Sequence, residues 1–405
     1  MKFLIYILYI FCVFVLGNLR IGPLSFRVYA TIMMILYLVH RRQSLIIEGK
    51  SYLKLYCLFI FLHGVSLILS GDPGISHYIH DILAYYLVAI VIFISVPNFV
   101  TNEADFNSFI KYFSVFLLLD AAVTIFQYRG IYIGWIVSQA VNNYGTFIED
   151  GMSTSADNLL GRSLSIGLFP YAFVNAPFLA SGVCLMLSCL VRNLKKYEKI
   201  YYILVIVVST YACFATQQRS AFFALVLFIG LYLWVFSKKT LAIASIIAIT
   251  GIIVLGWTID VDSLGRIGEV NNASDEARRM IWKNSIQYIQ DHFMFGGPDN
   301  CISRYGYPHN FFLAAFIYSG ILGAWPVLLL FFKVLVLTIR QMLKSILNKS
   351  SNMCVCCAFA VSLSQGMTHN NSMLNGDALL FFVLALLIHL VSINSIEHGY
   401  AYTAK

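Results

Sequence analysis

Charged residues are scarce in this sequence. Only 11% of its 405 residues are charged, whereas 60% are hydrophobic and the mean hydropathy is +0.79. Soluble globular domains are about 25% charged, so a water-soluble protein of ordinary composition is excluded. The composition instead indicates a chain that lies largely within a lipid bilayer.

The sequence also lacks a leader cleavage pattern after its first apolar run and a second cysteine in its polar segments. The first apolar run is followed by Gly17-Asn18-Leu19-Arg20, which contains no small-x-small cleavage pattern, and a second apolar run begins at once. We therefore expect the first run to be retained as a membrane span. Of the nine cysteines only Cys301 lies away from the apolar runs, so the polar segments offer it no disulfide partner.

Long apolar runs make up most of the chain. About 20 helical residues cross the roughly 30 Å hydrocarbon core of a bilayer. We therefore expect an all-α polytopic integral membrane protein, with residues 1–405 forming one membrane domain of about twelve transmembrane helices. The predicted spans are 3–17, 22–40, 52–70, 79–96, 108–127, 171–191, 200–216, 220–236, 240–258, 310–332, 353–369 and 377–395.

Basic residues define the expected orientation. They collect in one alternating set of short loops, which the positive-inside rule places in the cytoplasm together with both termini. The net charge of +8 follows from this topology and predicts no nucleic-acid partner. The residues concerned are Arg41, Arg42, Lys50, Lys54, Arg192, Lys195, Lys196, Lys199, Lys238, Lys239, Lys333, Arg340, Lys344 and Lys349.

Two long polar stretches, 128–170 and 259–309, fall on the opposite, outer side. Long loops that are not of low complexity are usually functional. The second stretch contains DEARRMIWKNSIQYIQDHFMFGG, in which Ile281, Ser285, Tyr288 and Ile289 recur at helical spacing. We expect an amphipathic surface helix there, forming a cap on the outer side.

Polar residues with chemical potential lie where the outer loops meet the membrane. An arginine on this side departs from the positive-inside bias and favours an anionic partner. Asp120 lies in the middle of the fifth span, so it is expected to face the bundle or water and could line a substrate cavity. The residues at the loop edges are Arg219, Arg278, Arg279, His309 and Asn310.

Simpler readings of the same residues stay open. Arg219 could anchor the chain to lipid phosphates, and Arg278 and Arg279 could pair with acidic neighbours on a solvated helix face. His309 could be a helix-entry residue that bonds locally. For Asp120 a hydrogen bond to a neighbouring helix is the simpler role.

Arginine and histidine have complementary chemistry at such a place. A guanidinium binds phosphate bidentately and keeps its charge, whereas histidine takes up a proton near neutral pH. This combination suits a lipid diphosphate donor, with histidine accepting the proton of an attacking hydroxyl. His77, His80 and Asp81 could hold a metal, but no fourth ligand is evident, so we expect neither metal nor cofactor.

Several stretches resemble the bacterial O-antigen polymerase and O-antigen ligase superfamily. TQQRSAFFALVLF resembles the family's Ser-Arg-Gly/Ala step into a helix, and RRMIWKNSIQYIQDHFMFGG resembles its Arg-x3-Trp segment ending in glycines. HNFFLAAFIYSGILGAW resembles its His-Asn helix with Gly-x2-Gly, and GRSLSIGLFPYAFVNAPFLASG its arginine-containing entry motif. The resemblance covers about residues 160 to 330.

The resemblance implies roles for individual residues. Arg219 and Arg278 would bind the diphosphate, with Arg279 able to replace Arg278, although the four-residue spacing to Trp282 favours Arg278. His309 would be the catalytic base or would orient the acceptor. Further candidates for the site are Arg162, Asn310 and Asp120.

The resemblance also implies a function and a place. It predicts a membrane-type (GT-C-like) glycosyltransferase of the bacterial inner membrane with a periplasmic active site. The donor would be an undecaprenyl-diphosphate-linked oligosaccharide and the acceptor another lipid-linked repeat unit, as in a polymerase, with a chain-length regulator as a further partner. Transfer to lipid A core by a ligase is the alternative, and a transporter or flippase is a weaker one.

Overall fold

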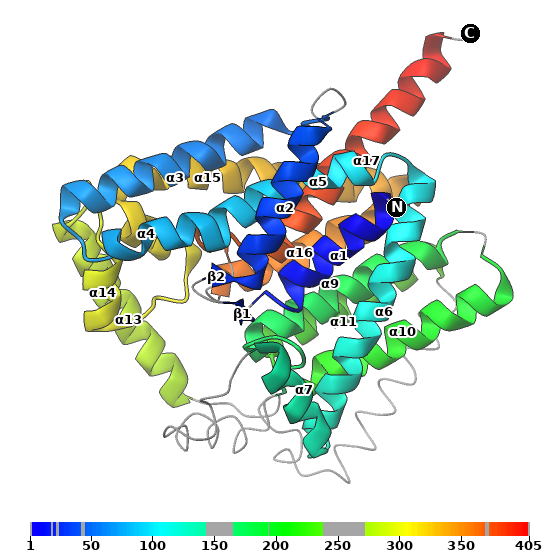
Figure 1. Ribbon diagram of the computed structural model, residues 1–405, viewed down its shortest axis with the longest axis horizontal. Helices are drawn as coiled ribbons and strands as arrows, with labels where there is room; N and C mark the ends of the chain where they lie inside the picture. Colours follow the sequence, from blue (N-terminus) through cyan, green and yellow to red (C-terminus); the bar gives the residue numbers. More distant parts are fainter. Residues whose placement is uncertain are drawn as a thin grey trace. The chain divides into compact units, whose positions relative to one another are not determined.

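The computed structural model describes residues 2–17, 19–21, 24–41, 45–142, 165–192, 194–237, 272–368 and 372–403 (Figure 1). The described residues are mostly helical. The one sheet among them is a two-stranded antiparallel ribbon, in which β1 (Arg20–Ile21) pairs with β2 (Leu24–Ser25). The expected all-α class is confirmed for this part of the chain.

The helices follow the apolar runs closely. Those of the first half are α1 (Lys2–Phe14), α2 (Phe26–His40), α3 (Lys50–Ser70), α4 (Ile75–Asp81), the π-helix η2 (Ile82–Tyr86), α5 (Leu87–Phe99), α6 (Glu103–Tyr128), α7 (Tyr132–Asn142) and α9 (Ala172–Leu190). Those of the second half are α10 (Lys196–Ala215), α11 (Arg219–Phe236), α13 (Asn272–Asp291), α14 (Pro298–Tyr305), α15 (Phe311–Leu347), α16 (Asn352–Thr368), the short η4 (Met373–Asn375) and α17 (Ala378–Thr403).

Seven of the described helical segments are long and apolar enough to cross a membrane, and the chain is a multi-pass membrane protein. They are Lys50–Ser70, Ile75–Phe99, Glu103–Tyr128, Ala172–Leu190, Lys196–Ala215, Arg219–Phe236 and Phe311–Leu347. Shorter apolar helices occupy four other expected positions, whereas the run 240–258 lies outside the described residues. The total of twelve spans therefore stays a prediction.

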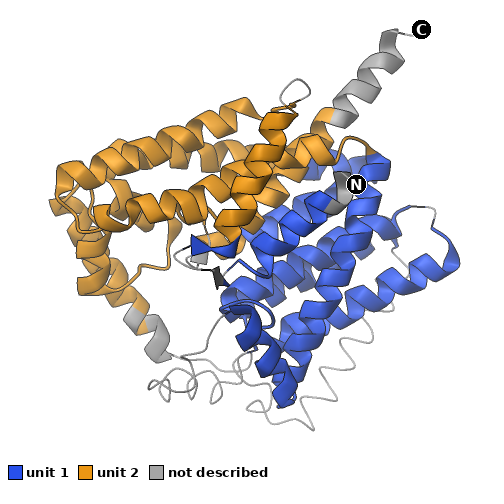
Figure 2. Cartoon of the chain, viewed as in Figure 1, with its two compact units in different colours: residues 1–26, 103–270, 341–362 blue, residues 27–102, 271–340, 363–405 orange. Residues whose placement is uncertain are grey.

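The chain divides into two compact units, each assembled from three segments (Figure 2). Unit 1 contains residues 1–26, 103–270 and 341–362, and unit 2 contains residues 27–102, 271–340 and 363–405. Each unit thus brings together parts of the chain that are far apart in sequence. The expectation of one membrane domain over 1–405 stays a prediction.

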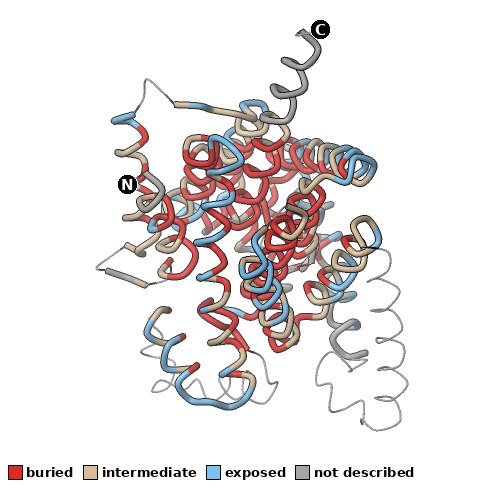
Figure 3. Tube along the Cα trace, turned by 90° about the vertical axis from the view of Figure 1, so that its right-hand side faces the viewer, coloured by how far each residue is buried: buried red, intermediate tan, exposed pale blue. Residues whose placement is uncertain are grey.

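Unit 1 is organised around α9. Every residue from Asn175 to Cys189 is buried, which is the pattern of a helix surrounded by others. Figure 3 draws the buried residues of the chain in red. Helices α10, α11 and α6 pack against it. Gly182 lets α6 approach closely, because a Cβ at this position would lie 2.5 Å from the Leu117 side chain.

Unit 2 contains the segments that carry His309 and Arg278. Its α5 packs against α17, and α13 packs against α14. Helix α13 confirms the amphipathic helix expected after Asp275, since Ser285 and Tyr288 on it are buried.

Helix α15 differs from the expectation of an uninterrupted span over 310–332. Its backbone leaves helical geometry at Ser319 (φ −149°, ψ 16°) and Gly320 (φ 54°, ψ −164°). The conformation at Gly320 belongs almost exclusively to glycine, and a Cβ there would lie 2.3 Å from the carbonyl oxygen of Met294. Apolar composition could not reveal this break, because the residues on both sides of it are equally apolar.

The segment 293–297, which links α13 to α14, supplies the hydrogen bonds that the break in α15 leaves open. The Gly297 N–H donates to the carbonyl of Ile317 at 2.9 Å, and the Ile321 N–H donates to the carbonyl of Phe293 at 2.8 Å. Irregular backbone within a membrane protein requires such internal partners. The two glycine-containing motifs of the sequence therefore form one structural joint.

Candidate functional site

Asp72 holds the start of α14. Its carboxylate is fully buried and accepts hydrogen bonds from the backbone N–H groups of Gly74 (2.8 Å), Asp299 (3.3 Å) and Asn300 (3.2 Å). A carboxylate at a helix N-terminus satisfies unpaired N–H groups and complements the helix dipole. Asp72 thereby fastens the turn after α3 to the segment that precedes His309. Sequence analysis missed this role, although Asp72-Pro73-Gly74 carries a turn signal.

Trp282 joins α13 to the residue before His309. Its indole Nε1 donates a hydrogen bond of 2.5 Å to the carbonyl oxygen of Pro308. Trp282 belongs to the Arg-x3-Trp stretch and Pro308 directly precedes the His-Asn stretch, so two motifs 26 residues apart meet at one bond. The motif spacing relates Trp282 to Arg278 but carries no information about its partner Pro308.

Arg278 lies one helical turn before Trp282 on α13 and interacts electrostatically with His309. Its side chain is partly buried, whereas the side chain of Arg279 is exposed. The structure therefore brings His309 together with Arg278.

His309 has an unusual backbone for a residue with a side chain. Its φ is +47°, in the left-handed region that non-glycine residues seldom adopt. Such strain is concentrated at functional sites. The Tyr307 ring stands edge-on to the imidazole, with 5.4 Å between ring centroids.

The electrostatic surroundings keep the imidazole neutral. Burial lowers the pKa of His309 below its ordinary value of 6.5, and the positive charge of Arg278 lowers it further. A neutral imidazole has a lone pair that can accept a proton. At neutral pH His309 is thus in the form that a general base requires.

Asn310 caps the start of α15. Its Oδ1 accepts hydrogen bonds from the N–H groups of Phe312 (3.0 Å) and Leu313 (3.2 Å) at the start of α15. This is the geometry of an N-cap residue. The cap fixes where α15 begins and so fixes the backbone on which His309 stands.

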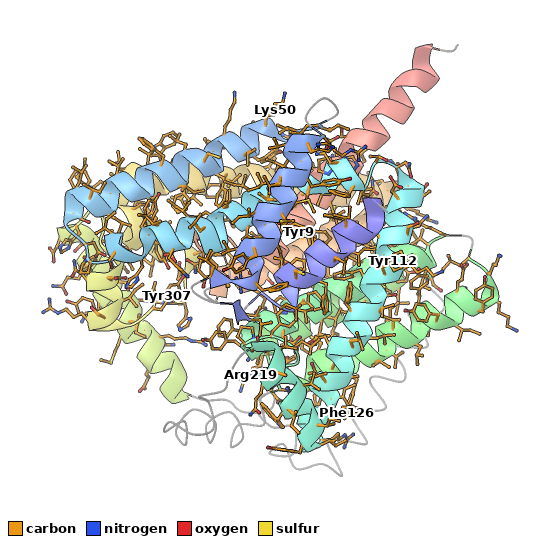
Figure 4. The ribbon with its side chains drawn as sticks, in the orientation of Figure 1. Tyr9, Lys50, Tyr112, Phe126, Arg219 and Tyr307 are labelled. Atoms are coloured by element: carbon orange, nitrogen blue, oxygen red, sulfur yellow. The ribbon has the colours of Figure 1, made fainter. Side chains whose placement is uncertain are left out.

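Arg219 belongs to unit 1 and is the first residue of α11 (Figure 4). The turn before it is tight, because Gln217 has a φ of +56° and the buried Thr216 hydroxyl accepts from the Gln218 N–H at 3.4 Å. Arg219 is partly buried. Two of the sequence-predicted site residues, Arg219 and His309, thus follow or occupy left-handed backbone, which no motif spacing could predict.

Asp120 is buried inside unit 1, as expected for a carboxylate in mid-span. Its Oδ1 accepts a hydrogen bond of 2.8 Å from the Leu168 N–H. Gly167 lies against the same carboxylate, and a Cβ there would come within 2.3 Å of Asp120 Oδ1. Asp120 therefore holds the segment that leads into α9, whereas Arg162 lies outside the described residues.

The candidate metal ligands His77, His80 and Asp81 lie on α4. His80 Nδ1 lies 3.4 Å from Asp81 Oδ1 in an exposed pair. Among the described residues no group of three or more His, Cys, Asp or Glu side chains is arranged to hold a metal ion.

The described helices define a multi-pass membrane protein in which the positive charge of Arg278 on α13 acts on His309, just before the start of α15. Residues 204–332 match the family model described as O-antigen ligase. This match covers about a third of the chain and confirms, for that region, the resemblance to the O-antigen ligase and polymerase superfamily, whose members are glycosyltransferase-like enzymes. No curated protein matches the sequence. The matched region contains Arg219, Arg278 and His309 but neither Arg162 nor Asp120.

Proposed function

We propose that this protein polymerises a surface glycan at the periplasmic face of a bacterial inner membrane. It transfers the glycan from undecaprenyl diphosphate to a hydroxyl of another lipid-linked repeat unit. The observation that carries this proposal is the proximity of a neutral His309 to Arg278 on a backbone fastened by Trp282. The family match supports the same reaction class.

In the proposed reaction His309 accepts the proton of the acceptor hydroxyl. The hydroxyl oxygen attacks the anomeric carbon of the donor, and the bond from that carbon to the diphosphate oxygen breaks. The electron pair of this bond leaves with undecaprenyl diphosphate, whose added negative charge Arg278 stabilises through a bidentate contact. No redox step and no covalent enzyme intermediate is needed.

The roles proposed for the other site residues come mainly from their sequence motifs. Arg219 is assigned to the diphosphate by its motif, and its partly buried position at a helix start agrees with binding an anion. Arg279 is exposed, which favours Arg278 for the phosphate role. Arg162 is assigned by motif alone. Asp120 is better explained by its bond to Leu168 than by contact with the donor.

The orientation is part of the proposal. The basic loops place both termini in the cytoplasm, and His309 then faces the periplasm. The neutral state of His309 and the strained backbone beneath it suit a reaction centre at the membrane surface.

Ligation to lipid A core is the second candidate function. The matched family model is described as O-antigen ligase, and the same base and arginines could serve either acceptor. Transport is the weaker alternative, because transporters show repeated halves with broken spans at the midplane, and no such repeat is evident in the sequence.

A deletion strain tests the proposal. We expect lipopolysaccharide with core plus one repeat unit and no ladder, with the ladder restored by the wild-type protein but not by His309→Ala. Bare core with polymer held on the lipid carrier would instead identify the ligase. An unchanged ladder would contradict both functions.

A further inference from the structure

Three tyrosines of unit 2 come from places where the backbone is irregular. Tyr86 ends the π-helix η2, Tyr318 is the last residue before the break in α15, and Tyr307 lies in the connection from α14 to α15 (Figure 4). Short π-helical segments and broken membrane helices occur frequently at functional sites. Three irregular backbone segments of unit 2 thus each contain a tyrosine.

These tyrosines lie close together and next to the catalytic base. Electrostatic interactions link the phenol of Tyr307 to those of Tyr86 and Tyr318, and link the last two to each other. The Tyr307 ring is 5.4 Å from the His309 ring. We call Tyr86, Tyr307 and Tyr318 the tyrosine cluster. One side of the tyrosine cluster therefore faces the group that accepts the proton.

The carboxylates of Asp81 and Asp299 also interact with the tyrosine cluster. Asp81 interacts electrostatically with both Tyr86 and Tyr318, and Asp299 interacts with Tyr318 and with Asp81. The Asp81 side chain is 42% exposed, so its oxygens are accessible. Neighbouring negative charges repel phosphate, which makes this part of unit 2 unsuitable for the diphosphate of the donor.

The buried His63 contacts two members of the tyrosine cluster, Tyr318 and Tyr86. His63 Nδ1 lies 2.9 Å from the Tyr318 carbonyl oxygen, and the His63 ring is 5.5 Å from the Tyr318 ring and 6.5 Å from the Tyr86 ring. Tyr78 stands edge-on to His63 and donates its hydroxyl proton to the carbonyl of Ile60. The cluster is therefore a preorganised surface, which lowers the entropic cost of binding.

The Tyr86 residue is 3% exposed and Tyr318 is partly buried. Neither the Tyr86 nor the Tyr318 hydroxyl makes a hydrogen bond to another residue in the described part of the chain, whereas the Tyr307 hydroxyl bonds to Asn375. Aromatic rings pack on the C–H faces of sugars, and phenol hydroxyls bond to sugar oxygens. Ionised carboxylates accept hydrogen bonds from neighbouring sugar hydroxyls.

We propose that the tyrosine cluster, together with Asp81 and Asp299, is the subsite that holds a pyranose ring of the acceptor glycan beside His309. This inference rests on the proposed function and adds the residues that select the acceptor. The two carboxylates favour an uncharged or amino sugar over an acidic one, because a second negative charge would be repelled.

Phenylalanine variants test the subsite without removing ring area. The full-length protein is purified in detergent and mixed with the soluble repeat-unit oligosaccharide, released from its lipid carrier by mild acid. This probe lacks the diphosphate and can act only as an acceptor. We expect Tyr318→Phe and Tyr86→Phe each to raise its Kd about three- to tenfold, because each variant loses one hydrogen bond to the ligand. Asp299→Asn should act in the same direction.

Two matched variants are the controls. Tyr112→Phe removes a hydroxyl from an exposed tyrosine of α6 in unit 1 (Figure 4) and should leave the Kd unchanged. Tyr78→Phe loses the bond to Ile60 and should lower thermal stability. An unchanged Kd in folded Tyr318→Phe and Tyr86→Phe would overturn the subsite.

Kinetics with both substrates separate this inference from the proposed function. In proteoliposomes the KM for the soluble acceptor should rise in Tyr318→Phe, while the KM for the lipid-linked donor stays the same. A rise in the donor KM alone would overturn the acceptor assignment. If the wild-type protein binds the oligosaccharide but transfers nothing, the proposed function fails, and the Kd changes still decide the subsite.

Discussion

The indole Nε1 of Trp282 donates a hydrogen bond of 2.5 Å to the carbonyl oxygen of Pro308. This bond links α13, which carries Arg278, to the backbone that carries His309. His309 is held at a φ of +47°, a conformation that persists only where the surroundings enforce it. The hydrogen bond from Trp282 to Pro308 and the helix cap at Asn310 hold the backbone on either side of His309.

Trp282→Phe should therefore lower the transfer rate while leaving the amount of folded protein near normal. The variant keeps an aromatic ring but loses the donor N–H, so Pro308 and His309 can move. Misplacement of a catalytic group by about 1 Å costs up to about 10²-fold, and we expect a fall in kcat of at least about tenfold. Trp325→Phe, at an exposed position of α15, is the control. Equal kcat values in Trp282→Phe and wild type would contradict the positioning role.

Arg278 should be more important than Arg279. We expect Arg278→Ala to lose about 10²- to 10³-fold in kcat/KM, as for other groups that stabilise a leaving charge. Arg278→Lys should lose most activity as well, because an ammonium group cannot make the bidentate contact. Arg279→Ala should be mild, since that side chain is exposed. The assignment is wrong if Arg279→Ala proves the more damaging change.

The pH dependence of transfer should report the state of His309. A general base acts in its neutral form, so activity rises as pH rises through the pKa. Because burial and Arg278 lower the pKa of His309 from 6.5, kcat/KM should reach half its maximum below pH 6.5. A half-maximal point above pH 6.5 would show that His309 is protonated more easily than its surroundings indicate.

Gly320→Ala should destabilise unit 2 strongly. The new Cβ would lie 2.3 Å from the Met294 carbonyl oxygen, and the backbone there is left-handed. We expect a cost of at least about 1–3 kcal/mol, seen as a lower thermal unfolding midpoint in detergent. Gly230→Ala in α11 is the matched control, because no atom lies within 4 Å of its added Cβ. That change should be neutral or stabilise by about 0.5–1 kcal/mol.

Single cysteines should reveal the topology. In a background without the native cysteines, an impermeant thiol reagent should label Ser303→Cys, on the exposed side of α14, from the periplasm. Ser237→Cys, just after α11, should react only after the membrane is opened. The opposite labelling pattern would reverse the proposed orientation and move His309 to the cytoplasmic side.

The sequence determined what depends on composition and local pattern. Scarce charge and long apolar runs required membrane helices, and the spacing around Ser285 and Tyr288 required an amphipathic helix. The motifs containing Arg219, Arg278 and His309 indicated the resemblance that the family model over residues 204–332 supports. Each of these inferences uses residues that are neighbours along the chain.

Only the tertiary structure decided which distant segments meet. Gly320 breaks α15 because the segment near Met294 approaches it and replaces its helical hydrogen bonds, and neither stretch contains a local signal of the other. The hydrogen bond from Trp282 to Pro308 and the electrostatic interaction between Tyr86 and Tyr318 also join segments that are far apart in sequence. Such contacts depend on packing between elements far apart in sequence, where hydropathy is uniform and carries no register. The sequence therefore determined which residue types are present for chemistry, and the packing of unit 2 decided that the charge of Arg278 acts on His309.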